Sequence, residues 1–107
     1  IPYWDFDSPD APDYQRDASA GAIMASSFIE LAGFTQDKAL SKNLMAMAEK
    51  QIRTLASPEY LAEKGTNGHF LLKHSVGSYP SNTEVNVPLT YADYYFLEAL
   101  LRINGKL

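Results

Sequence analysis

Two stretches of this chain are apolar on nearly every face of a helix, and this feature constrains the fold most. Residues 18–32 are rich in alanine and place Ile23, Phe28 and Leu31 around the helix rather than along one stripe. Residues 91–102 are apolar nearly all round as well. Such helices are buried on several sides, but a chain of 107 residues buries only about two thirds of its unfolded surface. We therefore expect both helices to pack against helices that lie outside this chain.

The region between these stretches predicts an amphipathic helix over about residues 36–56. Its apolar positions recur at three- and four-residue steps, and they are Leu40, Leu44, Met47, Ala48, Ile52 and Leu55. Residues 17–56 should thus form a helical hairpin with one inner and one outer member. Asp17 and Ser19 stand where the first helix should begin, Gly33 where it should end, and Ser57-Pro58 where the second should end.

The remaining segments predict loops, short strands and a last helix. Residues 1–16 hold three of the six prolines and predict an ordered loop. Residues 57–89 predict a loop with two short strands, at 69–76 and 84–87, and residues 90–104 a final helix. Tyr94-Tyr95-Phe96 on that helix should be core. The fold class is therefore all-α, with about three helices and a loop that contains a hairpin.

Composition excludes several kinds of function. The chain has no cysteine and two histidines, so we expect no metal site and no cofactor. The net charge of −4 arises in residues 1–17, which hold five aspartates and one arginine, whereas the rest is balanced. No Lys/Arg cluster offers a surface for phosphates, so we expect neither nucleic acid nor a membrane as partner. No apolar run approaches the ~18 residues of a membrane span.

Few residue patterns suggest chemistry. His74 and Ser75 are adjacent, so in a strand they point to opposite faces, which argues against a catalytic triad. His69 and His74 are five apart and also point to opposite faces, which argues against a metal site. Asp5 and Asp7 lie beside Tyr3 and Trp4, and aromatic faces with carboxylates suit sugar binding. The alternatives for this acidic stretch are a calcium-binding loop, a solvated, turn-rich entry to a helix, or carboxylates that cap the following helix.

Four ordered motifs resemble one known family. They are Pro2-Tyr3-Trp4-Asp5-Phe6-Asp7, Arg16-Asp17-Ala18-Ser19-Ala20, the run from Gly68 to Gly77, and the run from Val85 to Arg102. Together they resemble the C-terminal part of glycoside hydrolase family 88, the unsaturated glucuronyl hydrolases. The resemblance covers residues 1–107 but only about the last quarter to third of that family's usual domain. It implies an (α/α)6 barrel of which this chain, beginning at Ile1 rather than Met, is a C-terminal section.

The resemblance also implies an activity. The family releases unsaturated uronic acid from lyase-generated oligosaccharides by hydrating the C4=C5 vinyl ether, with an aspartic acid as proton donor. Its catalytic aspartates lie upstream of this chain, so we expect no catalytic residue here, and Asp5 and Asp7 match a mainly architectural motif. The chain alone should be inactive. Its partners would be the oligosaccharide and the rest of the barrel, and a bacterial cytoplasm or periplasm is the compartment most compatible with the resemblance.

The expected site residues lie beside the aglycone. The loop around His74 and Ser75 resembles a segment that lines the aglycone subsite. Some relatives carry a Ser-x-x-Ser-x-Lys pattern there that reads a sulfate; Ser75 and Ser78 fit it, but Pro80 replaces the lysine. Together with the aromatic Trp4, the predicted substrate-binding residues are His74, Ser75, Ser78 and Trp4. Asn86 stands where many relatives have Asp.

Two other functions stay open. One is the related unsaturated rhamnogalacturonyl hydrolase family, with the same barrel and chemistry. The other is a non-catalytic helical module that buries its apolar faces in an oligomer or against a partner.

Overall fold

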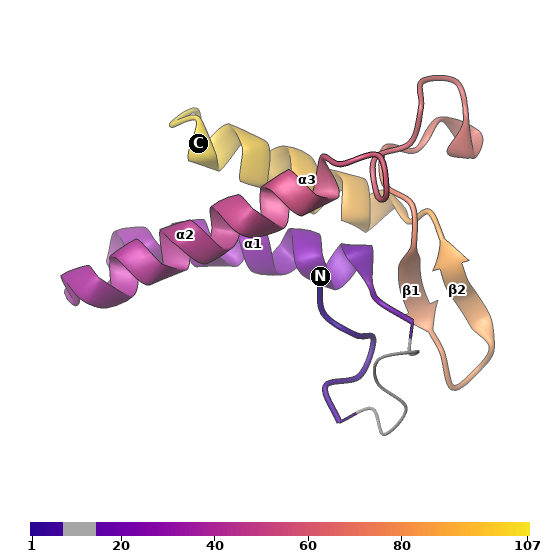
Figure 1. Cartoon of the computed structure of the whole chain (residues 1–107), viewed down its shortest axis with the longest axis horizontal. Coiled ribbons are helices and arrows are strands. Elements are labelled where there is room, and N and C mark those ends of the chain that lie inside the picture. Colours follow the sequence, from indigo (N-terminus) through magenta and orange to yellow (C-terminus); the bar gives the residue numbers. More distant parts are fainter. Residues whose placement is uncertain (8–14) are drawn as a thin grey trace.

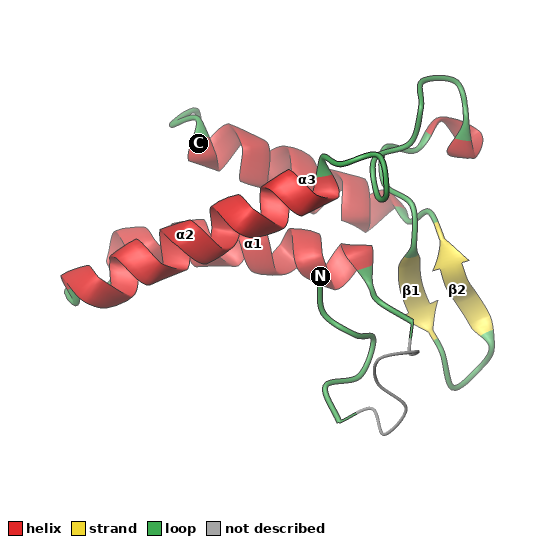
Figure 2. Cartoon of the chain, in the orientation of Figure 1, coloured by secondary structure: helices red, strands yellow, loops and turns green. Residues whose placement is uncertain are grey.

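The computed structural model describes residues 1–7 and 15–107. Its elements are α1 (Ala18–Phe34), α2 (Lys38–Leu55), a short 3₁₀ turn (Asn67–His69), β1 (Ser75–Ser78), β2 (Thr83–Val87) and α3 (Thr90–Ile103). Helices make up most of the regular structure, and the strands form one small antiparallel hairpin (Figures 1 and 2). The all-α class with three helices and a hairpin-containing loop is confirmed. The predicted loop over 1–16 falls partly on residues 8–14, which lie outside the described residues.

Helix α1 is the central element of the packing. It contacts both α2 and α3, which touch each other much less. Ala18, Ala22 and Ala25 line the buried side of α1 and have no exposed surface, so the neighbouring helices can approach closely. These residues join Ile52 and Leu55 of α2 and Ala92, Phe96 and Ala99 of α3 in one core cluster.

The ends of the first two helices follow from local hydrogen bonds. Asp17 caps α1 and Asp37 caps α2, each by accepting from main-chain N–H groups of the first turn. The predicted end of the first helix at Gly33 is wrong. The helix runs to Phe34, and the last turn is closed by a 3.0 Å bond from Thr35 N–H to the Leu31 carbonyl.

The strand predicted over residues 69–76 is also wrong in extent. His69 and His74 both have left-handed backbone angles (φ +68° and +66°), which interrupt an extended chain. Residues 67–69 form the 3₁₀ turn instead, and the strand β1 begins only at Ser75. The Asp93 carboxylate of α3 holds the intervening loop by accepting from the N–H groups of Leu71 (2.8 Å) and Leu72 (3.0 Å).

Large apolar side chains remain exposed on all three helices. On α3, Phe96 is 3% exposed as predicted for core, but Tyr94 is 60% exposed, so the prediction of a core position is wrong for Tyr94. Exposed large apolar residues on the helices include Ile23, Leu31, Phe34, Leu40, Met45, Met47, Tyr91, Leu97 and Leu101. Among the described residues, no helix combines the length and apolar character that crossing a membrane requires.

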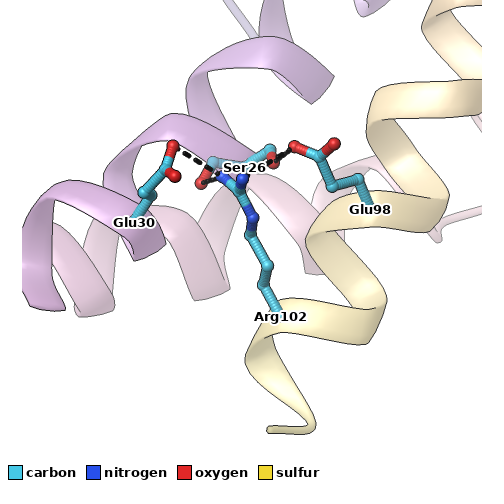
Figure 3. A network of polar contacts seen from close by, with 4 residues as sticks. All are labelled: Ser26, Glu30, Glu98 and Arg102. Carbon is cyan, nitrogen blue, oxygen red and sulfur yellow. Dashed lines mark hydrogen bonds and ion pairs between the residues drawn. The ribbon is translucent and has the colours of Figure 1, made fainter. Parts of the chain in front are cut away.

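A half-buried charged network joins α1 to α3 (Figure 3). Arg102 donates to the Ser26 carbonyl (2.9 Å) and pairs with Glu30 (3.1 Å) of α1 and Glu98 (3.3 Å) of α3. The Ser26 hydroxyl in turn donates to Glu98 at 2.5 Å. Because Arg102 pairs with the largely buried Glu98, and the half-exposed Glu30 is open to water, the network can lie between the helices.

Candidate functional site

The predicted site residues lie where the N-terminal segment, the start of α1 and the β1–β2 hairpin come together. Figure 1 shows this hairpin at one end of the helices, beside the N-terminal segment. Asp17 connects the three parts. Its Oδ1 accepts from the N–H (2.9 Å) and hydroxyl (2.7 Å) of Ser19 and from the N–H of Val76 in β1 (3.0 Å), while its own N–H donates to the Pro2 carbonyl (2.9 Å). This carboxylate therefore fixes the framework of the site.

Trp4 lies against the tip of the hairpin. Its ring stacks on the Tyr79 ring with centroids 4.6 Å apart and an angle of 11° between the planes. The main-chain N–H of Trp4 donates to the Gln15 carbonyl (3.0 Å), which fixes the N-terminal segment. Tyr79 follows Ser78 at the end of β1, so the hairpin fixes its position. Trp4 and Ser78 are half-buried, so part of each side chain is open to a ligand.

His74 occupies the other end of β1. Its Nδ1 lies 2.5 Å from Oδ1 of Asn86, and its ring meets the edge of the Tyr60 ring at a centroid distance of 5.8 Å. Burial raises the pKa of the Tyr60 hydroxyl, with a smaller contribution from Glu59. The backbone at Asn86 is left-handed like that of His74, and the register of the hairpin shifts between Ser75 and Val76. A bulge of this kind redirects side chains locally.

Ser75 does not reach the surface. It has no exposed area, and its hydroxyl makes no hydrogen bond within the described part of the chain. A side chain without exposed surface cannot touch a ligand in this arrangement. The structure therefore does not support the direct sugar contact predicted for Ser75, although Ser75 lies between His74 and Val76 in the wall of the site.

The carboxylates and histidines singled out from the sequence form no paired centre. Asp5 accepts from the N–H of Asp7 (2.9 Å) in a local turn, and neither residue caps α1, which Asp17 caps alone. His69 is exposed on the 3₁₀ turn, and the predicted opposite faces of a strand do not apply to it. No group of three or more His, Asp or Glu suited to a metal ion occurs within residues 1–7 and 15–107. Asp10 and Asp13 lie outside the described residues.

Three residues of the site were missed in the sequence. Tyr79 and Tyr60 follow no recognisable spacing, since their neighbours come from segments distant in the chain. Asn86 was considered only as a departure from a family pattern, although Asn is enriched among the residues that adopt a left-handed backbone. Four surface hollows lie along α2 and α3, and none of the four is lined by the predicted site residues.

Comparison with known proteins shows clear relatives. No family model matches the chain. An unsaturated glucuronyl hydrolase from Formosa agariphila is 45% identical over 102 residues, which cover 95% of this chain and 24% of that protein. The crystal structure of an unsaturated glucuronyl hydrolase specific for heparin superposes with a TM-score of 0.93 and 46% identity, over 98% of this chain and 28% of that one.

A third relative was solved with a saccharide. A variant of the Streptococcus agalactiae unsaturated glucuronyl hydrolase, complexed with dGlcA-GalNAc6S, superposes with a TM-score of 0.82 and 30% identity, over 96% of this chain and 27% of that one. The chain thus spans about a quarter of the length of the relatives it matches. Its three helices and hairpin correspond to a portion of their helical barrel. In sequence and in fold, the chain resembles one section of the unsaturated glucuronyl hydrolases of glycoside hydrolase family 88, as its four motifs predicted.

Proposed function

We propose that these residues act as one wall of an unsaturated uronyl hydrolase. The protein that contains them would add a proton to C4 and water to C5 of a terminal unsaturated uronate. The C5 hemiketal then opens to a ketone by breaking its bond to the ring oxygen, which leaves a hemiacetal at C1. Breakdown of this hemiacetal breaks the bond from C1 to the glycosidic oxygen, so that this oxygen leaves with the aglycone sugar and the uronate is released as a keto acid. The observation that carries the proposal is the 45% identity to a hydrolase of this kind over 95% of the chain.

Asp17 and Asp93 serve the fold of this chain, which supports a catalytic acid located elsewhere in the enzyme. Asp17 already accepts three hydrogen bonds and Asp93 two, all from groups of this chain. A general acid needs a free oxygen within reach of the substrate carbon. Both oxygens of Asp93 are engaged. The three bonds of Asp17 all go to Oδ1, and this residue is nearly buried beneath β1 and the start of α1. Both observations agree with the family resemblance that places the catalytic aspartates upstream.

The contribution of this chain is to the aglycone side of the cleft. Trp4, His74 and Ser78 have accessible surface and lie along and beside β1, where a sugar ring could stack on Trp4 and bond to the two polar side chains. Ser75 belongs to the same wall as a buried support. Pro80 offers no cation, so a sulfate at this position would lack a charge-assisted donor from residue 80.

The rest of the barrel is the second partner in this proposal. The exposed apolar side chains of α1 and α3 are the surfaces that further helices would cover. Without them the cleft has one wall only. The purified 107-residue chain should therefore release no uronate from an unsaturated disaccharide.

The test follows the ultraviolet absorbance of the unsaturated uronate in two samples, the 107-residue chain and the full-length protein that carries it. The proposal predicts loss of absorbance only in the second sample. Release of uronate by the 107 residues alone would contradict it, and so would an inactive but folded full-length protein. Disaccharides derived from glycosaminoglycan and from pectin, compared on the full-length protein, separate a glucuronyl from a rhamnogalacturonyl hydrolase. Failure on both would favour a non-catalytic module.

A further inference from the structure

The bond between His74 and Asn86 determines where the ring proton of the histidine lies. Nδ1 of His74 is 2.5 Å from Oδ1 of Asn86, and an amide oxygen can only accept a hydrogen bond. This orientation of the Asn86 amide requires the proton of the bond to lie on Nδ1. In a neutral imidazole the other nitrogen, Nε2, is then a bare acceptor.

The surroundings of His74 leave Nε2 available. The groups packed around it are the Tyr60 ring, the Asn86 amide and the start of α1, where Ala18 N–H donates to the His74 carbonyl (3.0 Å). The nearest carboxylate of that helix start, Asp17, bonds to Ser19 and Val76 instead. No ion pair involves His74 within the described residues, and its Nε2 has no hydrogen bond there.

Both residues of this pair have an unfavourable backbone conformation. His74 (φ +66°), just before β1, and Asn86 (φ +55°), the unpaired residue of β2 at the bulge, are both left-handed. Non-glycine residues in this region are uncommon, and strained positions cluster at functional sites. The two side chains meet across the hairpin at these two left-handed positions.

We propose that Asn86 is a positioning residue that holds His74 in the Nδ1–H tautomer, so that Nε2 accepts a hydrogen bond from a ligand hydroxyl or amide N–H. This ligand role, unlike the tautomer, rests on the proposed function. An acceptor nitrogen suits a neutral sugar donor and disfavours an anionic oxygen at the same point. An Asp at position 86 would instead favour the doubly protonated ring, which has no acceptor.

The tautomer is tested by ¹⁵N NMR of the full-length protein labelled at histidine, recorded at alkaline pH, with the His74 signals assigned by their loss in His74→Gln. The proposal predicts a protonated Nδ1 and a bare Nε2. Asn86→Gly removes the amide while tolerating the left-handed backbone, and it should shift His74 toward the Nε2–H tautomer. Asn82→Gly is the matched control, because Asn82 is also left-handed (φ +50°) and should leave the His74 signals unchanged.

An Nε2–H tautomer in the unaltered protein, or no change in Asn86→Gly, would overturn the proposal. The ligand role is tested by adding a saturated disaccharide that cannot be hydrated, which should move the Nε2 signal and leave Nδ1 in place. An active enzyme whose Nε2 signal does not respond would overturn the ligand role but leave the proposed function intact. An inactive enzyme with the predicted tautomer would overturn the proposed function, and the ligand role with it, but would leave the tautomer assignment intact.

Discussion

Asp17 illustrates how one side chain can serve both an element and the tertiary fold. The sequence predicted a cap at this position, and the structure confirms it through the bond from Ser19 N–H. The bond to Val76 of β1 could not be read from the sequence, because the two residues are 59 positions apart. The carboxylate is nearly buried, so each of these donors depends on it for a partner.

Removal of the Asp17 carboxylate should therefore cost more than the loss of an ordinary cap. Asp17→Ala should lower the free energy of unfolding by about 2 to 3 kcal/mol, which combines a lost cap with a buried N–H left unpaired. Asp37→Ala is the matched control, because the Asp37 carboxylate accepts hydrogen bonds from Ala39 and Leu40 of its own helix and from no other described residue. It should cost about 1 kcal/mol in urea unfolding. Equal losses would contradict the tertiary role of Asp17.

Gly77 shows a constraint of another kind in the hairpin. A Cβ at this position would lie 2.7 Å from Cβ of Glu84, which real atoms do not tolerate. Gly77→Ala should destabilise the protein by about 1 to 3 kcal/mol through overpacking. Glu84 itself is left-handed (φ +51°), so Glu84→Gly should be tolerated and should restore much of the stability in the double variant. Purely additive losses in thermal unfolding would count against this contact.

At the scale of elements, the helices were predictable and the hairpin was only partly so. Alanine-rich and periodic stretches determine helices locally, and the observed ends differ by a few residues from the prediction, as at Gly33 and Phe34. The strand over 69–76 failed because His69 and His74 take left-handed angles that depend on tertiary contacts, including the bonds from Asp93 to the loop. Apolar alternation in the sequence carries no information about such contacts.

The network around Arg102 should contribute more to the free energy of unfolding than an exposed ion pair does, because it joins α1 to α3. The Arg102 side chain is 20% exposed and bonds to three groups, whereas Arg53 is 76% exposed and pairs only with Glu49. Arg102→Ala should lower the free energy of unfolding by about 2 to 3 kcal/mol, since Glu98 is left half-buried without its cation. Arg53→Ala should cost no more than about 0.5 kcal/mol. Similar losses in urea unfolding would contradict this difference.

At the scale of the whole molecule, the expectation of missing helical neighbours came from the sequence and agrees with the exposed apolar faces. The sequence could not show which side chains of α3 stay exposed, because the helix is apolar all round and only the packing against α1 selects Ala92, Phe96 and Ala99 for burial. The same limit applies to the candidate site. His74 and Trp4 were identified through family motifs, whereas their contacts with Asn86 and Tyr79 depend on the folded hairpin.

These faces predict that the 107-residue chain associates when it is alone in solution. Light scattering should give a mass above that of the monomer, because exposed Tyr94, Leu97 and Leu101 are apolar surface that water penalises. Leu97→Lys combined with Leu101→Lys should reduce the association. Lys42→Glu, an exposed change on the polar side of α2, should not. A folded monomer without these substitutions would contradict the account.

The most direct test of the central claim exchanges the corresponding section between proteins. The 107 residues would replace the matching quarter of the Formosa agariphila hydrolase, and the chimera would be assayed by loss of the absorbance of an unsaturated disaccharide, with cooperative thermal unfolding as the check that it is folded. If this chain is an equivalent wall of the same barrel, the folded chimera should retain activity within about tenfold of the parent, which corresponds to about 1.4 kcal/mol in transition-state stabilisation. A folded chimera without measurable hydrolysis would contradict the claim.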